Sequence, residues 1–160
     1  MKKIVLFAVF LMSAMVIAAC NGEEDDSSEN KSNPDVESQE AMSTMNDMVK
    51  DMEELDYSSI DFDVLYDDTE FEGEIHNDDG LVESEYYNPF NDTTERGPAA
   101  FDIMFPIVKE LKLDPDMTDE EAVATSIETF NLPEDFLKAE LQVTFKDGTE
   151  KVYEVKMNEM

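Results

Sequence analysis

Hydrophobic and polar residues alternate along three stretches that follow residue 56. Apolar side chains occupy every second position, with Asp and Glu between them, which is the period of a strand with one buried face. The stretches run over residues 60–66, 70–75 and 81–87. Asp79-Gly80 separates the last two and suits the positive φ angles of a hairpin turn. This pattern predicts an antiparallel meander with one acidic, solvent-facing side.

Two helical stripes come next. Pro98 suits the first turn of a helix, and apolar residues recur at three- and four-residue spacing from there to Leu111. Thr118 and Glu121 have the spacing of a capping box, which predicts a second helix starting after Thr118. Its apolar stripe ends at Phe130, before a helix-stopping Asn and Pro.

The last segment predicts a hairpin. Apolar residues alternate over residues 141–145 and 153–157, and Asp147-Gly148 between them matches a two-residue turn. The element order is a helix, described below, then three strands, two helices and two strands. It predicts an α+β fold with an antiparallel sheet of about five strands and two helices packed on one face.

Residues 39–56 form a Met-rich segment with a helical period. Its recurring apolar residues are Met42, Met45, Met48, Met52 and Leu55. Two roles remain open at this point. The segment either packs on its own domain or frays as a linker, or it presents an adaptable Met face to a partner.

The first 20 residues have the layout of a bacterial lipoprotein signal. Two lysines precede an apolar run, and residues 17–20 (Ile-Ala-Ala-Cys) match a lipobox, in which the cysteine thiol receives diacylglycerol. The alternatives are an uncleaved transmembrane helix and an ordinary signal peptide with an incidental cysteine. The 16 residues from Ile4 to Ala19 fall short of the ~20 that span a bilayer. We therefore expect lipidation of Cys20 and retention on the extracytoplasmic face of the cell membrane.

The domain organisation follows from these segments. We expect a signal peptide over residues 1–19, an acidic disordered tether over residues 20–38, the Met-rich helix or linker over residues 39–56, and an α+β domain over residues 57–160. The tether is rich in Asp, Glu, Ser and Asn and has too few apolar residues to fold.

The net charge of the chain restricts the classes of partner that it can bind. The chain has 41 acidic and 11 basic residues, a formal net charge of −30. Nucleic acid is excluded as a partner, because phosphate binding needs clustered Lys and Arg. An anionic membrane surface would repel the chain, so membrane attachment depends on the lipid. The acidity is explained by solubility, by a salty or alkaline surrounding, or by loose capture of divalent cations.

Residues for catalysis or metal binding are scarce. His76 is the only histidine and Cys20 the only cysteine, so a zinc cluster, a Ser-His pair within a G-x-S-x-G elbow and a structural disulfide are all excluded. An EF-hand with Gly80 at position six would place Ile75 and Tyr86 at ligand positions, where both fail. The sequence predicts no catalytic residue, no metal site and no cofactor.

Four stretches carry a family resemblance: residues 60–64, 99–113, 117–121 and 145–149. Over residues 57–157 the chain resembles the YusW-like family of small secreted or lipid-anchored proteins of Bacillus-type bacteria. The resemblance implies an extracytoplasmic location. It implies no site residues, because the matching positions are mainly core and turn positions.

The expected function is that of a non-enzymatic, lipid-anchored extracytoplasmic protein. Its domain would bind an envelope protein or have a structural role there. The alternative is a low-affinity module for divalent cations or small ligands that uses surface carboxylates.

Overall fold

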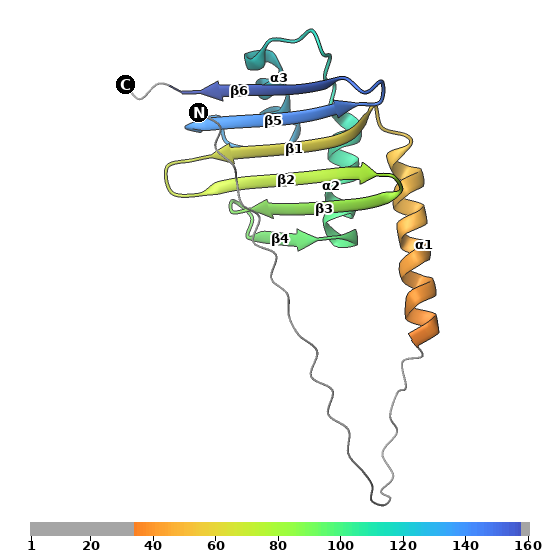
Figure 1. Cartoon of the computed structure of the whole chain (residues 1–160). Helices are drawn as coiled ribbons and strands as arrows, with labels where there is room; N and C mark the ends of the chain where they lie inside the picture. Colours follow the sequence, from red (N-terminus) through yellow and green to blue (C-terminus); the bar gives the residue numbers. More distant parts are fainter. Residues whose placement is uncertain (1–33, 158–160) are drawn as a thin grey trace, which may run out of the picture. The chain divides into compact units, whose positions relative to one another are not determined.

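The computed structural model describes residues 34–157, which form three helices and one six-stranded sheet (Figure 1). The helices are α1 (Pro34–Met52), α2 (Pro98–Glu110) and α3 (Asp119–Thr129). The strands are β1 (Tyr57–Leu65), β2 (Glu70–Asp78), β3 (Leu81–Asn88), β4 (Thr93–Arg96), β5 (Lys138–Phe145) and β6 (Glu150–Lys156). The predicted α+β class is confirmed, with one strand more than expected.

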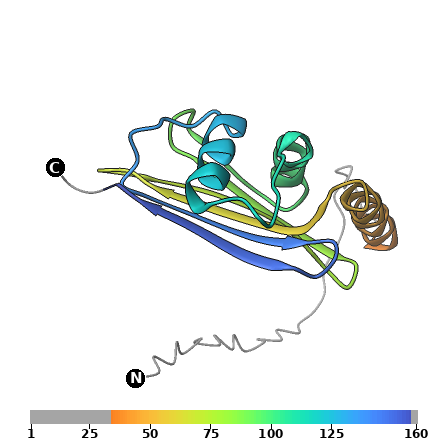
Figure 2. The same ribbon diagram turned by 90° about the horizontal axis from the view of Figure 1, so that it is seen from above.

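The sheet has the strand order β4-β3-β2-β1-β5-β6, and every neighbouring pair is antiparallel. β1, β2 and β3 form the predicted meander, and β4 extends it by one strand. α2 and α3 connect β4 to β5 and cover one face of the sheet, whereas no described element covers the other face (Figure 2). We call these the covered face and the open face.

The core lies between the covered face and the two helices. Alternate β1 residues point into it, and Ile60, Phe62 and Val64 are fully buried. The Phe62 ring lies 6.0 Å from that of Phe71 on β2 and 5.4 Å from that of Phe130, the C-cap residue of α3. Aromatic contacts therefore join the sheet to the end of α3.

The strand that the sequence did not predict is β4, which lies between the third predicted strand and the helix predicted from Pro98. Its residues are Thr-Thr-Glu-Arg, without the apolar alternation that marks the other strands. It pairs with β3 through backbone hydrogen bonds, and Arg96 reaches Glu85 at 3.1 Å. Because β4 is a short, polar edge strand, its position depends on its partner and not on a pattern of its own.

The two hairpin turns differ from each other. Asp79 (φ 48°) and Gly80 (φ 88°) form the predicted two-residue turn between β2 and β3. The turn between β5 and β6 is longer than the predicted two residues, because the four residues from Lys146 to Thr149 separate these strands. Gly148 takes the positive φ there, at 85°.

The Met-rich segment packs on the domain through its C-terminal half. Met48, Met52 and Leu55 are buried, and the Lys146 ammonium donates to the Met52 carbonyl at 2.9 Å. α1 lies at one end of the sheet (Figure 1), where the Val82 N–H contacts the Met45 sulfur at 3.2 Å. Met48, Met52 and Leu55 therefore pack on their own domain, whereas Met42 is 61% exposed.

The helix begins at Pro34 rather than at residue 39, so residues 34–38, expected to be tether, are helical. The signal peptide, Cys20 and the rest of the expected tether lie outside the described residues. No helix among residues 34–157 combines the length and the apolar character needed to cross a lipid bilayer.

Candidate functional site

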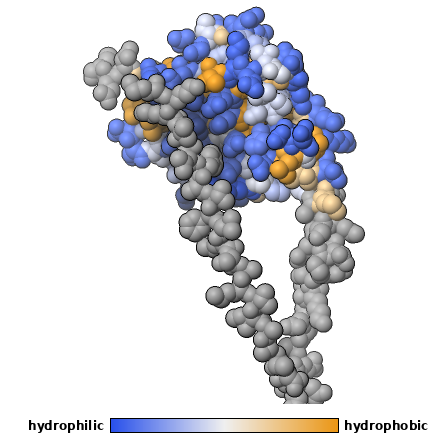
Figure 3. Space-filling model, in the orientation of Figure 1, coloured by the Kyte–Doolittle hydropathy of each residue, from blue (hydrophilic) through white to orange (hydrophobic). Residues whose placement is uncertain are grey.

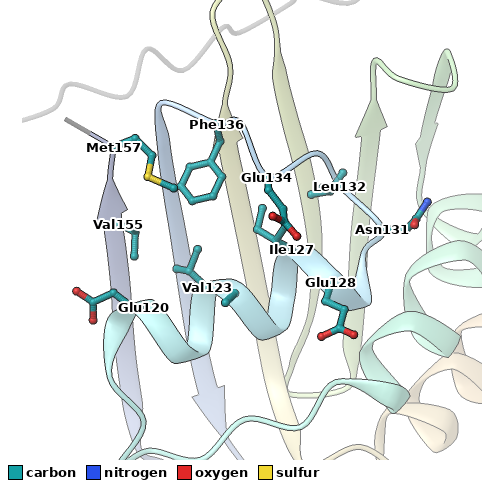
Figure 4. A pocket seen from close by; sticks show the side chains of 11 residues that line it. Glu120, Val123, Ile127, Glu128, Asn131, Leu132, Glu134, Phe136, Val155 and Met157 are labelled. Atoms are coloured by element: carbon teal, nitrogen blue, oxygen red, sulfur yellow. The ribbon is translucent and has the colours of Figure 1, made fainter. Parts of the chain in front are cut away.

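A cavity of about 670 Å³ opens beside α3 (Figure 4). Its walls come from α3, from the connection between α3 and β5, and from the end of β6. The apolar residues that line it are Val123, Ala124, Ile127, Leu132, Phe136, Val155 and Met157. A concave surface of this size with an apolar lining and a few polar groups is the usual form of a small-molecule site.

Local sequence places α3 at this cavity. The predicted capping box is confirmed: the Thr118 hydroxyl accepts from the Glu121 N–H at 3.3 Å, and the Glu121 carboxylate accepts from the Thr118 N–H at 3.1 Å. The helix stripe then turns Val123 and Ile127 toward the sheet, where both are buried. Ala124, one residue further round, is exposed and lines the cavity.

Hydrogen bonds hold the first residues of the connection after α3 in place. Asn131 adopts a positive φ of 54°, and the Leu132 N–H donates to the Ile127 carbonyl at 3.0 Å. The Tyr66 hydroxyl donates to the Pro133 carbonyl at 2.9 Å. Burial raises the pKa of Tyr66 to about 12, so this hydroxyl stays protonated and keeps its donor role. The cavity wall is therefore fixed by hydrogen bonds to α3 and to the neighbouring end of β1.

Three carboxylates surround the apolar lining. They belong to Glu120 and Glu128 on α3 and to Glu134 on the connection, and all three residues are exposed. None of them forms an ion pair within residues 34–157, and no Lys or Arg lines the cavity. The polar groups of the cavity are thus three carboxylates and the Asn131 amide.

The open face is the second unusual surface. Strand register places Asp61 opposite Glu74, and Asp63 opposite Glu72 on β2 and Glu140 on β5. Like charges directly opposite each other destabilise a sheet. Figure 3 shows this face, and what is visible of it is mostly hydrophilic.

These pairings alter the acidity of the two β1 aspartates. Partial burial, followed by the neighbouring carboxylates of Asp61 and Glu72, raises the pKa of Asp63 to about 6. Partial burial also raises the pKa of Asp61, and the carboxylate of Glu74 is the next largest cause. The centre of the open face therefore holds carboxylates that resist ionisation.

Lys138 and His76 contact carboxylates that lie opposite the two β1 aspartates. Lys138 bridges Glu140 at 2.6 Å and Glu154 at 3.0 Å on the β5–β6 side, and these carboxylates raise the pKa of Lys138. His76 lies in β2, with its side chain 27% exposed, and its ring nitrogens are 2.9 Å from Glu74 and 3.2 Å from Glu83. The histidine thus contacts two surface carboxylates on the open face, on the other side of the sheet from the cavity.

Within residues 34–157, no group of three or more His, Cys, Asp or Glu side chains is arranged to hold a metal ion. The open-face carboxylates are paired across strands but do not converge on a point. They can attract positive charge without enclosing it.

The sequence did not predict the cavity. Its α3 residues were expected in a helix, but only as a core stripe, and the connection after Asn131 was expected only as a stop signal. The available signal was the apolar content of that connection, where Leu132 and Phe136 flank a polar stretch. That signal does not show which element faces them. Cys20, the one site residue predicted from the sequence, lies outside the described residues.

Fold and surfaces together define a small acidic α+β domain with an apolar cavity on its helical side and a carboxylate-rich open sheet. The chain belongs to the YusW-like protein family, whose model matches residues 58–147. Comparisons with curated proteins and with solved structures gave no match. The family match includes α3 and the connection after it, but not the β6 side of the cavity.

Proposed function

We propose that the chain is a lipid-anchored protein of the extracytoplasmic face of the cell membrane, with a non-enzymatic domain that binds a small apolar or amphiphilic ligand. The cavity beside α3 carries this proposal. Its volume of about 670 Å³ lies within the roughly 300–1,000 Å³ that is usual for small-molecule sites.

The polar groups of the cavity support binding rather than catalysis. Three carboxylates and an amide can orient a ligand through charge and hydrogen bonds. No hydroxyl, thiol or imidazole side chain lines the cavity, so it holds no nucleophile paired with a base. Among the described residues, the single histidine contacts carboxylates on the opposite face of the sheet.

A series of neutral n-alkanols tests the cavity. Each added CH₂ that enters an apolar site contributes about 0.8 kcal/mol, so affinity should rise about fourfold per carbon from octanol to decanol. Methyl NMR signals of Val123, Ile127 and Val155 should shift on titration, whereas Val108, a buried residue of α2, should not. No chain-length dependence, or no shift at these methyls, would contradict the proposal.

A cavity-filling variant sharpens this test. Ala124 is exposed at the cavity, so Ala124→Trp adds volume there without removing core packing. Ala99 is an exposed alanine on α2, away from the cavity, and Ala99→Trp is its matched control. We expect Ala124→Trp to weaken decanol binding at least tenfold and Ala99→Trp to leave it unchanged. Equal losses in both variants would exclude this cavity as the binding site.

The anchor is tested separately. Two acyl chains on Cys20 would hold the protein firmly, since one chain gives only marginal binding and the polyanionic domain adds no attraction. Cys20→Ser should block lipid attachment and move the protein out of the membrane fraction in detergent partitioning. If the variant partitions with membranes as the wild type does, the lipid anchor is not what holds the chain there.

The open face supports a second candidate, the binding of a positively charged partner. The observation that favours it is the set of like-charged pairs across β1, β2 and β5, whose mutual repulsion destabilises the sheet. The partner would be a basic surface of an envelope protein or loosely held divalent cations. Calorimetry with Ca²⁺ and Mg²⁺ separates the two: saturation at submillimolar metal that Asp61→Asn abolishes would favour cations. Cross-linking in intact cells, against a tether-only control, would reveal a protein partner.

A further inference from the structure

The walls of the cavity beside α3 and its rim have opposite characters, and this contrast bears on the ligand. The walls are apolar, with Val123, Ile127 and Leu132 all buried. The rim is anionic, with Glu120 beside the first turn of α3, Glu128 in its last turn and Glu134 on the connection (Figure 4). A ligand that fills the cavity has its apolar part against the walls and its polar end at this negatively charged rim.

The charge on the rim is uncompensated within the described part of the chain. Lys138 and Lys156, the nearby β5 and β6 cations that form ion pairs, contact Glu140 and Glu154 on the open face. No basic side chain lines the cavity, so nothing there would neutralise an anionic headgroup. A carboxylate or phosphate on the ligand would be repelled by the rim, and an amine or quaternary ammonium would be attracted.

We infer that the ligand is a cationic amphiphile: an apolar body that occupies the cavity, with a positively charged group attracted to the anionic rim to which Glu120, Glu128 and Glu134 all contribute charge. This inference rests on the proposed function, because it assigns the ligand class of the same cavity. It excludes fatty acids and anionic lipids as occupants.

Three probes with one chain length test the inference. Decyltrimethylammonium, decanol and decyl sulfate share an apolar chain and differ in headgroup charge. Titrations below the micelle concentration, followed by the methyl signals of Val123 and Ile127, report occupancy of the cavity itself. We expect the ammonium probe to bind about tenfold or more tightly than decanol, from several exposed charge contacts. Decyl sulfate should bind most weakly, and 0.5 M salt should reduce the differences.

The strongly negative charge of the whole chain requires a control, because a cation could gather anywhere on its surface. The triple variant Glu120→Gln, Glu128→Gln, Glu134→Gln removes the rim charge. A matched triple, Glu53→Gln, Glu95→Gln, Glu110→Gln, removes three exposed carboxylates elsewhere. The rim variant should lose about tenfold in affinity for decyltrimethylammonium and keep its affinity for decanol. The matched triple should change either affinity by less than about twofold.

Each outcome has a distinct meaning. Equal binding of decanol and decyltrimethylammonium overturns the cationic ligand class but leaves the cavity as a binding site. Equal losses in the two triple variants also overturn it, since the attraction would then come from the overall charge. If decanol and decyltrimethylammonium both leave the Val123 and Ile127 methyls unshifted, the proposed function itself fails. Circular dichroism of both variants confirms that they are folded before the affinities are compared.

Discussion

The two faces of the sheet are built from the same strands, yet they contribute in opposite directions to stability. On β1, Phe62 points into the core and is fully buried, whereas Asp63, the next residue, points to the open face among other carboxylates. Burial of the apolar side chain stabilises the fold. Asp63, in contrast, lies where partial burial and neighbouring carboxylates disfavour its charged form. The comparison teaches that the covered face accounts for folding, while the open face needs another explanation, such as solubility or a partner.

The largest expected effect comes from breaking the covered face. Phe62→Ala removes a ring that contacts Phe71 and Phe130, and the remaining space cannot fully collapse. We expect a loss of about 3–5 kcal/mol in the free energy of unfolding, measured by urea denaturation. Val152→Ala on the open face, where the side chain is 59% exposed, should change stability by no more than about 0.5 kcal/mol. Similar losses at both positions would remove the distinction between the faces.

A smaller effect is expected where the covered face has no room for a side chain. A Cβ at Gly73 would lie 3.1 Å from the Phe71 ring and 3.3 Å from the Met104 sulfur. Gly73→Ala should therefore cost about 1–2 kcal/mol, because overpacking outweighs the entropy that alanine saves in the unfolded chain. A double-mutant cycle with Met104→Ala should show favourable coupling between the two substitutions. Strict additivity would show that the cost has another origin.

On the open face, removing the charge of Asp63 should raise the free energy of unfolding, whereas the substitutions on the covered face lower it. The pKa of Asp63 is about 6 in the fold against 3.8 ordinarily, so the folded state resists ionisation of this group. Its contribution to stability is fully present below pH 3.8 and is lost as the pH rises through about 6. A shift of this size corresponds to about 3 kcal/mol, which solvent screening of a half-exposed group reduces to about 1 kcal/mol.

Asp63→Asn should accordingly raise the free energy of unfolding by about 1 kcal/mol at pH 7 and by much less at pH 4. Thermal or urea unfolding across this pH range measures the difference between variant and wild type. Asp67→Asn, an exposed position in the turn after β1, is the matched control for loss of one negative charge. A lower stability of Asp63→Asn at pH 7 would show that this carboxylate is well accommodated in the fold.

The smallest effect is expected at Lys138 on β5, where a cation contacts two carboxylates of the open face. Lys138→Met removes the cation that contacts Glu140 and Glu154. Exposed ion pairs contribute about 0–1 kcal/mol each, so the loss should be below about 1 kcal/mol and should shrink in 0.5 M salt. A loss that does not depend on salt would point to packing of the lysine stem instead.

The sequence alone predicted a large part of this molecule. Period-two alternation gave β1, β2, β3, β5 and β6, and the Asp79-Gly80 turn and the Thr118–Glu121 capping box were also predicted correctly. These features depend on interactions between residues close in the chain, so local patterns contain them. The likeness to the YusW-like family was also readable from motifs and is confirmed over residues 58–147. The Cys20 motif predicts a lipid anchor at the extracytoplasmic face of the cell membrane, and this localisation stays a prediction.

Tertiary structure decided the rest. β4 exists because β3 offers an edge, the Met-rich helix is held by Lys146 from the β5–β6 turn, and Asp63 faces Glu140 only because β5 returns beside β1. The cavity forms because the end of β6 and the connection after α3 both come near one flank of α3. These are contacts between segments far apart in the chain, and their geometry depends on register and packing. Alternation specifies which face of a strand is apolar, but not what lies opposite it.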